Sequence, residues 1–233
     1  IYETEPDLTL LPKYTTGKRT VLWHAFAGSE NFQAGIRRIL QPKRWRLLGA
    51  PFPVNRYYLS PSYQEPDFDV LVFGSKARHY PLVLEACKLA GIERIAAVAD
   101  EEHLEVVREH GRRHRCEVHV SGPLSTTKLG TFIQRGKVVL NPIMPPSESH
   151  YSVSVPLGLG RPIVASDAPT VTPFVGPGLR VAALDSPADW AEQISFFLKD
   201  TESGFPYKPA LKQAKMNHDI HRFFADSLSR TIG

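Results

Sequence analysis

The chain has 233 residues, of which 42% are hydrophobic and 22% are charged, proportions that are ordinary for a folded globular protein. A chain of this length can bury a sizeable apolar core without disulfides or metals. Its net charge of +4 is too small a bias to indicate a DNA- or RNA-binding protein, and no apolar stretch approaches the roughly 18 residues that cross a bilayer.

Residues 1–67 are rich in proline and aromatic side chains and show little regular patterning. We expect one strand over residues 20–27, a short helix over residues 31–40 and a second strand near residues 45–50. These elements are too few for a second full α/β domain. The region is therefore predicted to be a small α/β segment, a remnant or reduced N-terminal lobe.

From residue 68 onwards, short apolar runs alternate with helical patterns. The predicted strands cover residues 69–74, 94–99, 116–121, 137–141, 162–166 and 179–184. The predicted helices cover residues 81–90, 101–109, 126–134, 152–159 and 187–198. Near-continuous apolar strands separated by helices are typical of a parallel sheet covered on both faces. We therefore predict a Rossmann-like, doubly wound α/β domain over residues 68–200, which binds ligands at the carboxyl ends of its strands.

Residues 201–233 are predicted to form a C-terminal segment dominated by one helix over residues 209–229. Its apolar stripe consists of Met216, Ile220, Phe223, Phe224 and Leu228. Such a stripe indicates that the helix packs on another apolar surface.

Several common signatures are missing from the sequence. It has neither the Gly-x-x-x-x-Gly-Lys-Ser/Thr loop of P-loop NTPases nor a Gly-x-Gly-x-x-Gly after the first strand of the domain. A Gly-x-Ser-x-Gly elbow is also missing, which disfavours a serine hydrolase. Gly158-Leu159-Gly160 precedes a strand rather than a helix, so it is predicted to be a tight turn and not a phosphate loop.

Two loops at the predicted ligand edge carry polar side chains. Lys76 and Arg78 follow the first strand of the domain and precede a helix that begins near Pro81, which is a natural anion site; a solvated basic turn is the alternative. Residues 141–152 carry hydroxyls and a histidine and open the next helix, whose free N–H groups face the same edge. An N-capping serine in a structural turn would give the same pattern, and both roles can hold together.

Histidines 110, 114 and 119 and Cys116 are spaced closely enough to suggest zinc. Gly111 is expected to end the helix between the first two histidines, however, so no metal site is predicted. The basic run at residues 112–115 is interpreted as a solvated turn rather than a nucleic-acid patch.

Four features follow one another along the domain. The first is a strand that ends in a glycine and a basic loop (residues 72–78), and the second is a strand that ends at Gly122. The third is a strand that leads to Asn141-Pro142, and the fourth is Gly160-Arg161-Pro162, which precedes an apolar strand and Ser166-Asp167. In this order, residues 69–199 resemble the C-terminal, donor-binding domain of GT-B glycosyltransferases, nearest to glycosyltransferase family 4. In such enzymes the C-terminal helix crosses back to the first lobe. Because that lobe is normally of similar size to the second, the chain is expected to be a fragment or to have a reduced first lobe.

The resemblance implies a site for a nucleotide-sugar donor. Lys76 and Arg78 would bind its diphosphate, the Gly122-Pro123 turn would lie by the nucleobase, and backbone N–H groups from Ser149 to Ser152 would meet the phosphates and the sugar. The implied donor site comprises Gly74, Lys76, Arg78, Gly122, Pro123, Ser147, Ser149, His150, Tyr151 and Ser152. Glu148 and His150 are the candidate catalytic residues.

One motif of the family is degenerate here. Counting back from Gly160 puts Ser147 and Val155 at the positions of the family's Glu-x7-Glu pair, whose second glutamate holds the ribose hydroxyls. Val155 cannot accept a hydrogen bond from ribose, and Glu148 lies one residue from the first position.

The resemblance implies a metal-independent glycosyltransferase without a cofactor, which moves a sugar from a nucleotide-sugar substrate to an unknown acceptor (a glycan, a lipid or a protein). A non-catalytic GT-B-like binding or scaffolding module is the alternative, and a sugar-nucleotide epimerase is a third reading. Two cysteines in a chain of this length and the lack of a signal-peptide pattern favour a cytoplasmic location. Peripheral membrane contact stays open, and no nucleic-acid partner is expected.

Overall fold

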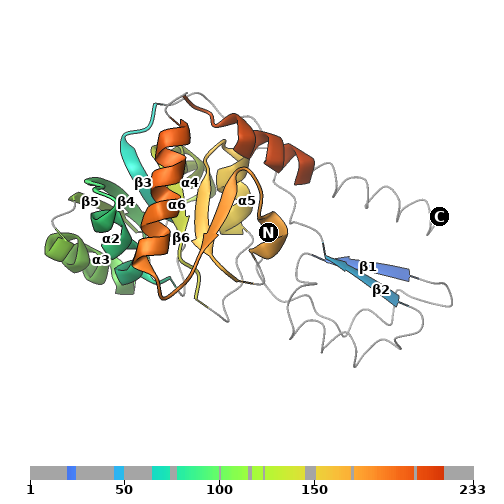
Figure 1. Cartoon of the computed structure of the whole chain (residues 1–233), viewed down its shortest axis with the longest axis horizontal. Helices are drawn as coiled ribbons and strands as arrows, with labels where there is room; N and C mark the ends of the chain where they lie inside the picture. Colours follow the sequence, from blue (N-terminus) through green and yellow to red (C-terminus); the bar gives the residue numbers. More distant parts are fainter. Residues whose placement is uncertain are drawn as a thin grey trace.

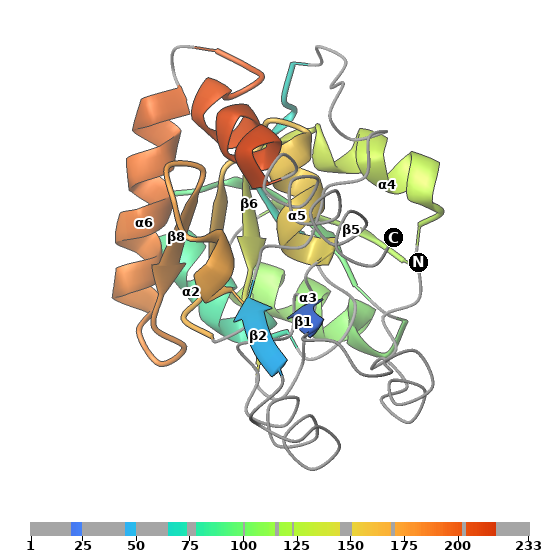
Figure 2. The same cartoon turned by 90° about the vertical axis from the view of Figure 1, so that its right-hand side faces the viewer.

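The computed structural model describes most of the chain from residue 65 to residue 217. The described ranges are residues 65–73, 78–99, 101–114, 117–122, 124–144, 151–168, 171–201 and 204–217, with the strands at 20–24 and 45–49 described by their backbone. Within these ranges the dominant feature is one sheet with helices on both faces (Figures 1 and 2).

The sheet has six strands, all parallel, in the order β5-β4-β3-β6-β7-β8. They are β3 (Phe68–Phe73), β4 (Arg94–Val98), β5 (Glu117–Ser121), β6 (Gly136–Asn141), β7 (Ile163–Ser166) and β8 (Leu179–Ala182). Most of their valine, leucine, isoleucine and alanine side chains are buried, and those of the edge strands β5 and β8 are partly so, as a sheet covered on two sides requires. The predicted Rossmann-like α/β fold is confirmed.

The helices form a layer on each face of the sheet. On one side lie α2 (Tyr80–Leu89), α3 (Glu101–His114) and α6 (Pro187–Asp200), with α2 packed between the other two. On the other side lie α4 (Thr126–Ile133) and α5 (Tyr151–Gly158); Figure 2 shows the sheet between these two and α6.

Local sequence signals explain where several of these helices begin and end. The backbone N–H of Leu82 donates to Nδ1 of His79 at 3.2 Å, which caps α2, and Ser186 caps α6 in the same way through Asp189. After α5, Gly160 turns the chain into β7 with a φ of 68° and lies against Pro206. A side chain at position 160 would meet both backbone strain and a clash, so the predicted tight turn is confirmed.

Helix α3 differs from the prediction. It was expected to end at residue 109, with Gly111 as its stop, but it continues through Gly111 to His114. A helical glycine costs about 1 kcal/mol relative to alanine, whereas Gly111 is buried here and its helix packs on β5 and α2. Tertiary packing therefore outweighs the local preference.

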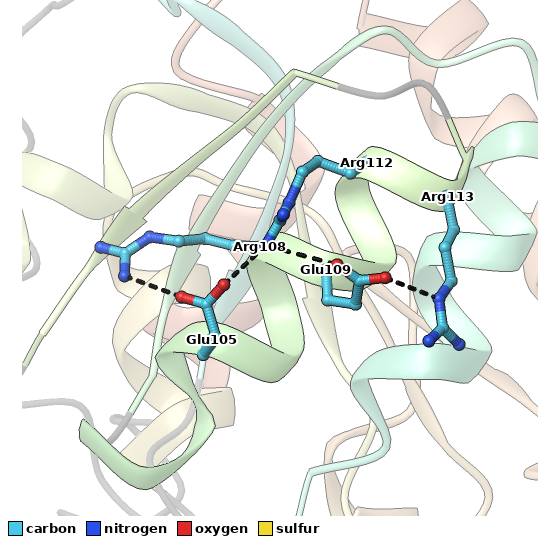
Figure 3. Close-up of polar contacts among 5 residues, drawn as sticks. All are labelled: Glu105, Arg108, Glu109, Arg112 and Arg113. Atoms are coloured by element: carbon cyan, nitrogen blue, oxygen red, sulfur yellow. Dashed lines mark hydrogen bonds and ion pairs between the residues drawn. The ribbon is translucent and has the colours of Figure 1, made fainter.

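The basic run at the end of α3 is part of a charged, exposed helix face rather than a turn (Figure 3). Glu105 pairs with Arg108 at 3.6 Å and with Arg112 at 2.6 Å, while Glu109 pairs with Arg112 at 3.3 Å and with Arg113 at 3.0 Å. Pairs three or four residues apart support a helix by roughly 0.2–0.5 kcal/mol each. These pairs give the arginines a solvated structural role.

The two ends of the chain are described only in part. In the N-terminal region, β1 (Thr20–His24) and β2 (Trp45–Gly49) pair in parallel as a separate two-stranded sheet, which confirms both predicted strands; the helix expected at residues 31–40 lies outside the described residues. The C-terminal helix begins at residue 208 and is described to residue 217. The boundaries at residues 67 and 200 remain predictions. None of the described helices combines the length and the apolar character that crossing a bilayer requires.

Candidate functional site

The strand order reverses between β3 and β6. From β3 the chain proceeds through β4 to β5 on one side, and from β6 it proceeds through β7 to β8 on the other. The loops that leave the carboxyl ends of β3 and β6 therefore diverge to opposite faces of the sheet. Ligands of doubly wound proteins bind in the crevice at this switch point.

Arg78 comes from the loop after β3 and is fixed at the switch point by its backbone. It forms an antiparallel bridge with Ile143, in the loop after β6. The neighbouring N–H of His79 donates to the carbonyl of Pro142 at 2.9 Å. These contacts tie together the two loops that border the crevice.

The side chain of Arg78 joins a buried polar group, which we call the switch-point cluster: Arg78, Asn141 and Ser152. The Ser152 hydroxyl, in the first turn of α5, accepts hydrogen bonds from Nη2 of Arg78 at 3.2 Å and from Nδ2 of Asn141 at 3.0 Å. Asn141 is the last residue of β6. The exposed fractions are 5% for Arg78, 0% for Asn141 and 2% for Ser152. A charged group is thus held in a poorly solvated place at the ligand edge.

Tyr80 and His103 lie near the carboxyl end of β4, the strand next to β3. Tyr80, the first residue of α2, donates its hydroxyl to the carbonyl of Val98 at the end of β4, at 3.1 Å. Its ring lies 5.9 Å from that of His103 on α3. Because Nδ1 of His79 accepts the N–H of Leu82, the neutral His79 ring carries its proton on Nε2. Tyr80 thus joins the start of α2 to the carboxyl end of β4 and to α3.

The structure brings together two of the side chains predicted for the donor site, Arg78 and Ser152. Gly122 follows β5, so β4 lies between its strand and β3. Tyr151 begins α5, and its side chain is not described. The remaining predicted residues lie outside the described part of the chain; they are Gly74, Lys76, Pro123, Ser147, Glu148, Ser149 and His150.

Two residues of this region were not understood from sequence. Asn141 was predicted as the last residue of a strand and the first of the following loop but was not among the candidate site residues, although a polar residue that ends a buried Val-Val-Leu strand is a usable signal. Val155 was placed at a ribose-binding position by the family resemblance, but it is 1% exposed and belongs to the apolar core. Its side chain packs in the interior and does not border an open crevice.

Two ionisable groups outside the switch-point cluster, Asp69 and Tyr207, have displaced pKa values. Burial alone would raise the pKa of Asp69, at the start of β3, but hydrogen bonds and charge from Lys137 and Arg94 hold it below its ordinary value. Burial, followed by the hydrogen bond and the charge of Asp200, raises the pKa of Tyr207. Among the described residues, no three histidine, cysteine, aspartate or glutamate side chains lie together as metal ligands would.

The fold is that of an α/β protein of the doubly wound class, and a buried arginine lies at its switch point. No protein-family model matches the sequence, and no curated protein matches it. Among solved structures, a glycosyltransferase from Rickettsia africae is similar with a TM-score of 0.65, over 94% of this chain and 63% of that one, at 11% identity. Sucrose-phosphate synthase from Thermosynechococcus elongatus gives 0.61, over 90% and 59%, at 13% identity.

A third similar structure is Anabaena HepE in complex with UDP and glucose, with a TM-score of 0.57 over 85% of this chain and 60% of that one, at 15% identity. The chain spans less than two thirds of the length of each of these three proteins. Structural matches to GT-B glycosyltransferases therefore extend over most of the chain. At these identities the likeness shows that the chain shares their fold.

Proposed function

We propose that this chain is the nucleotide-sugar-binding part of a glycosyltransferase that transfers a sugar, without a metal, to a glycan, lipid or protein acceptor. The observation that carries the proposal is the buried Arg78 guanidinium at the switch point of a GT-B-like sheet. A cation in a poorly solvated crevice interacts strongly with an anionic ligand. A nucleoside diphosphate supplies such an anion.

In this proposal the leaving diphosphate is stabilised by fixed cations and dipoles rather than by a covalent intermediate. Arg78 and Lys76 would bind its charge, and the N-terminus of α5, near Ser149 to Ser152, would direct backbone N–H groups at it. The Gly122-Pro123 turn would lie by the nucleobase. Glu148 and His150 are the candidates for proton transfer at the acceptor.

One observation favours a second function, a non-catalytic module with the same fold. Val155 stands where the resemblance places a ribose-binding glutamate, and it is buried in the core. A chain that has lost this contact could keep the GT-B shape as a binding or scaffolding surface. The two functions differ in whether a nucleotide sugar is bound and turned over.

The deciding experiment measures binding and hydrolysis of a nucleotide-sugar panel by the 233-residue chain. UDP is the first probe, because structures that share this fold carry it in their complexes, followed by ADP and GDP and their sugar conjugates. Calorimetric binding together with slow release of free sugar supports the glycosyltransferase. Binding without any release, tested also with added candidate acceptors, supports the module. Binding of none of these ligands would overturn the proposed nucleotide site.

A further inference from the structure

The switch-point cluster joins parts of the chain that are distant in sequence. Arg78 and Ser152 are separated by 74 positions, and Asn141 and Ser152 by 11. The inference that follows rests on the proposed function, in which Arg78 receives a diphosphate. We propose that Asn141 is a positioning residue, which holds the Arg78 guanidinium through Ser152 in the orientation that binds the phosphate groups.

The cluster connects the rigid sheet, through Ser152, to the loop that carries Arg78. Asn141 is fixed within the sheet, where it is the register partner of Ala165 in β7. Its Nδ2 donates to the Ser152 hydroxyl oxygen, which also accepts from Arg78. A hydroxyl oxygen has two lone pairs, so these two donors occupy both. The guanidinium is thereby oriented by a strand residue, which is a more precise support than a loop can give.

The burial of Asn141 is not explained by stability alone. The residue is 0% exposed, and its Oδ1 has no hydrogen-bond partner. An unpaired amide oxygen inside a protein costs free energy that a leucine at the same place would not cost. The amide does supply a fixed hydrogen-bond donor to Ser152, and Ser152 in turn orients Arg78.

The loop itself does not depend on this side chain. The Arg78–Ile143 bridge and the hydrogen bond from His79 N–H to the Pro142 carbonyl hold the two loops together through the backbone. Removing the Asn141 amide is therefore expected to leave the loop in place and to remove one of the contacts that orient the guanidinium. Replacing Asn141 should therefore weaken ligand binding more than it lowers fold stability. Replacing a purely structural asparagine would not separate the two effects.

The test is a double-mutant cycle on UDP binding by the full chain. Asn141→Leu is expected to raise the Kd for UDP about five- to tenfold, the value of one well-placed hydrogen bond. In an Arg78→Ala background the same change should alter Kd by less than about twofold, because its effect passes through Arg78. Ser152→Ala should match Asn141→Leu, and Ser152→Thr, which keeps the hydroxyl, should restore most of the affinity.

Asn217→Leu is the matched control. Asn217 is also a buried asparagine with an unpaired amide atom, on the helix at residues 208–217. That helix is attached near Gly160 and Gly178, which precede β7 and β8 at the other end of the sheet. The control is expected to leave the Kd for UDP within about twofold of the parent value, since it lies apart from the cluster.

Each outcome bears on the proposal. Loss of affinity by Asn141→Leu that disappears in the Arg78→Ala background supports it. Additive losses in the two backgrounds, or equal losses from Asn217→Leu and Asn141→Leu, would overturn it while leaving the nucleotide site intact. If Asn141→Leu does not fold, the Ser152→Ala and Ser152→Thr pair in both backgrounds gives the same decision. A parent chain that binds none of UDP, ADP and GDP overturns the proposed function first, and the positioning role with it.

Discussion

The two ends of the central sheet carry charge in different ways. At the amino end, Asp69 accepts hydrogen bonds from Lys137 at 2.8 Å and from Arg94 at 3.0 Å; Arg94 is exposed to solvent and Lys137 is half-buried. At the carboxyl end, Arg78 is almost completely buried and donates to the neutral hydroxyl of Ser152. The amino end pairs opposite charges that remain partly solvated. The carboxyl end holds a cation that is largely shielded from water.

This difference is the reason why we assign ligand binding to the carboxyl end. Ion pairs that remain solvated contribute about 0–1 kcal/mol and attract further ligands only weakly. A buried cation keeps much more of its interaction with an anion, because the surrounding dielectric is low. The amino end is therefore a charge-paired, partly solvated surface, whereas the carboxyl end holds the buried cation to which our proposal assigns the diphosphate.

The largest expected effect tests whether the face of α5 around position 155 belongs to the core or to the crevice. Val155→Glu should lower the free energy of unfolding by about 3–5 kcal/mol, because it buries a carboxylate without a partner. Urea unfolding measures this, and Val155→Gln separates the effect of charge from that of size. A Val155→Glu protein as stable as its parent would mean that the side chain reaches the crevice, as the family resemblance implied.

The next effect compares the cations at the two ends directly. Replacing Lys76 and Arg78 together by alanine should weaken nucleoside-diphosphate binding at least about tenfold, at ~1–3 kcal/mol for charge-assisted contacts. The control double variant, Arg94→Ala with Lys137→Ala, removes the same net charge from the amino end. Calorimetry should find its affinity close to that of the parent. Equal losses from both double variants would mean that net charge, and not the switch point, governs binding.

A smaller effect concerns the amino end alone and its dependence on pH. Lys137 and Arg94 keep the pKa of Asp69 below its ordinary value despite partial burial, so the carboxylate stabilises the fold at pH values above that ordinary value. This contribution is lost as the pH falls through the lowered, folded-state pKa. Asp69→Asn should thus cost about 1 kcal/mol or less at pH 7.

Unfolding curves at neutral and acid pH check this, since the difference between parent and variant should shrink below about pH 4. Nucleoside-diphosphate affinity should not change in Asp69→Asn. A variant whose deficit grows in acid would contradict the assignment of the pKa direction.

The sheet could be predicted from sequence because each buried strand is an apolar run with its own boundaries. The expected bounds of β3 differ from the observed ones by one residue at each end, and those of β6 by one residue at the amino end alone. Helix α3 was mispredicted because Gly111 is a local stop signal, while the packing that overrides it comes from other parts of the chain. The periodicity of apolar residues predicts which face of a helix is buried, but it does not identify the element that packs against that face.

The candidate site was predictable only in part for a related reason. Arg78 follows a strand and precedes a helix, so its place at the ligand edge was evident from local pattern. Its contact with Ser152 depends on β3 and β6 being neighbours, which is a property of the strand order. Asn141 joins them for the same reason, and no local pattern contains that information.

The smallest expected effect concerns the sugar of the nucleotide. With Val155 in the core, no carboxylate is available at that position to hold the ribose hydroxyls. A site that binds a hydroxyl through a buried polar group rejects the analogue without it strongly, because that group is left unpaired. A site without such a group has no means of rejection. We therefore expect affinities for UDP and 2′-deoxy-UDP to differ by less than about threefold.

Competition binding of the two nucleotides to the parent chain measures this ratio, and it sharpens the comparison between the ends of the sheet. A ratio near one means that binding at the carboxyl end comes from the phosphates, and hence from the buried cation. Strong preference for UDP would mean that another acceptor holds the ribose, with Glu148 as the first residue to replace by glutamine. If that replacement removed the preference, Glu148 would have taken the role that Val155 cannot fill, and the degenerate motif would be a displaced one rather than a lost one.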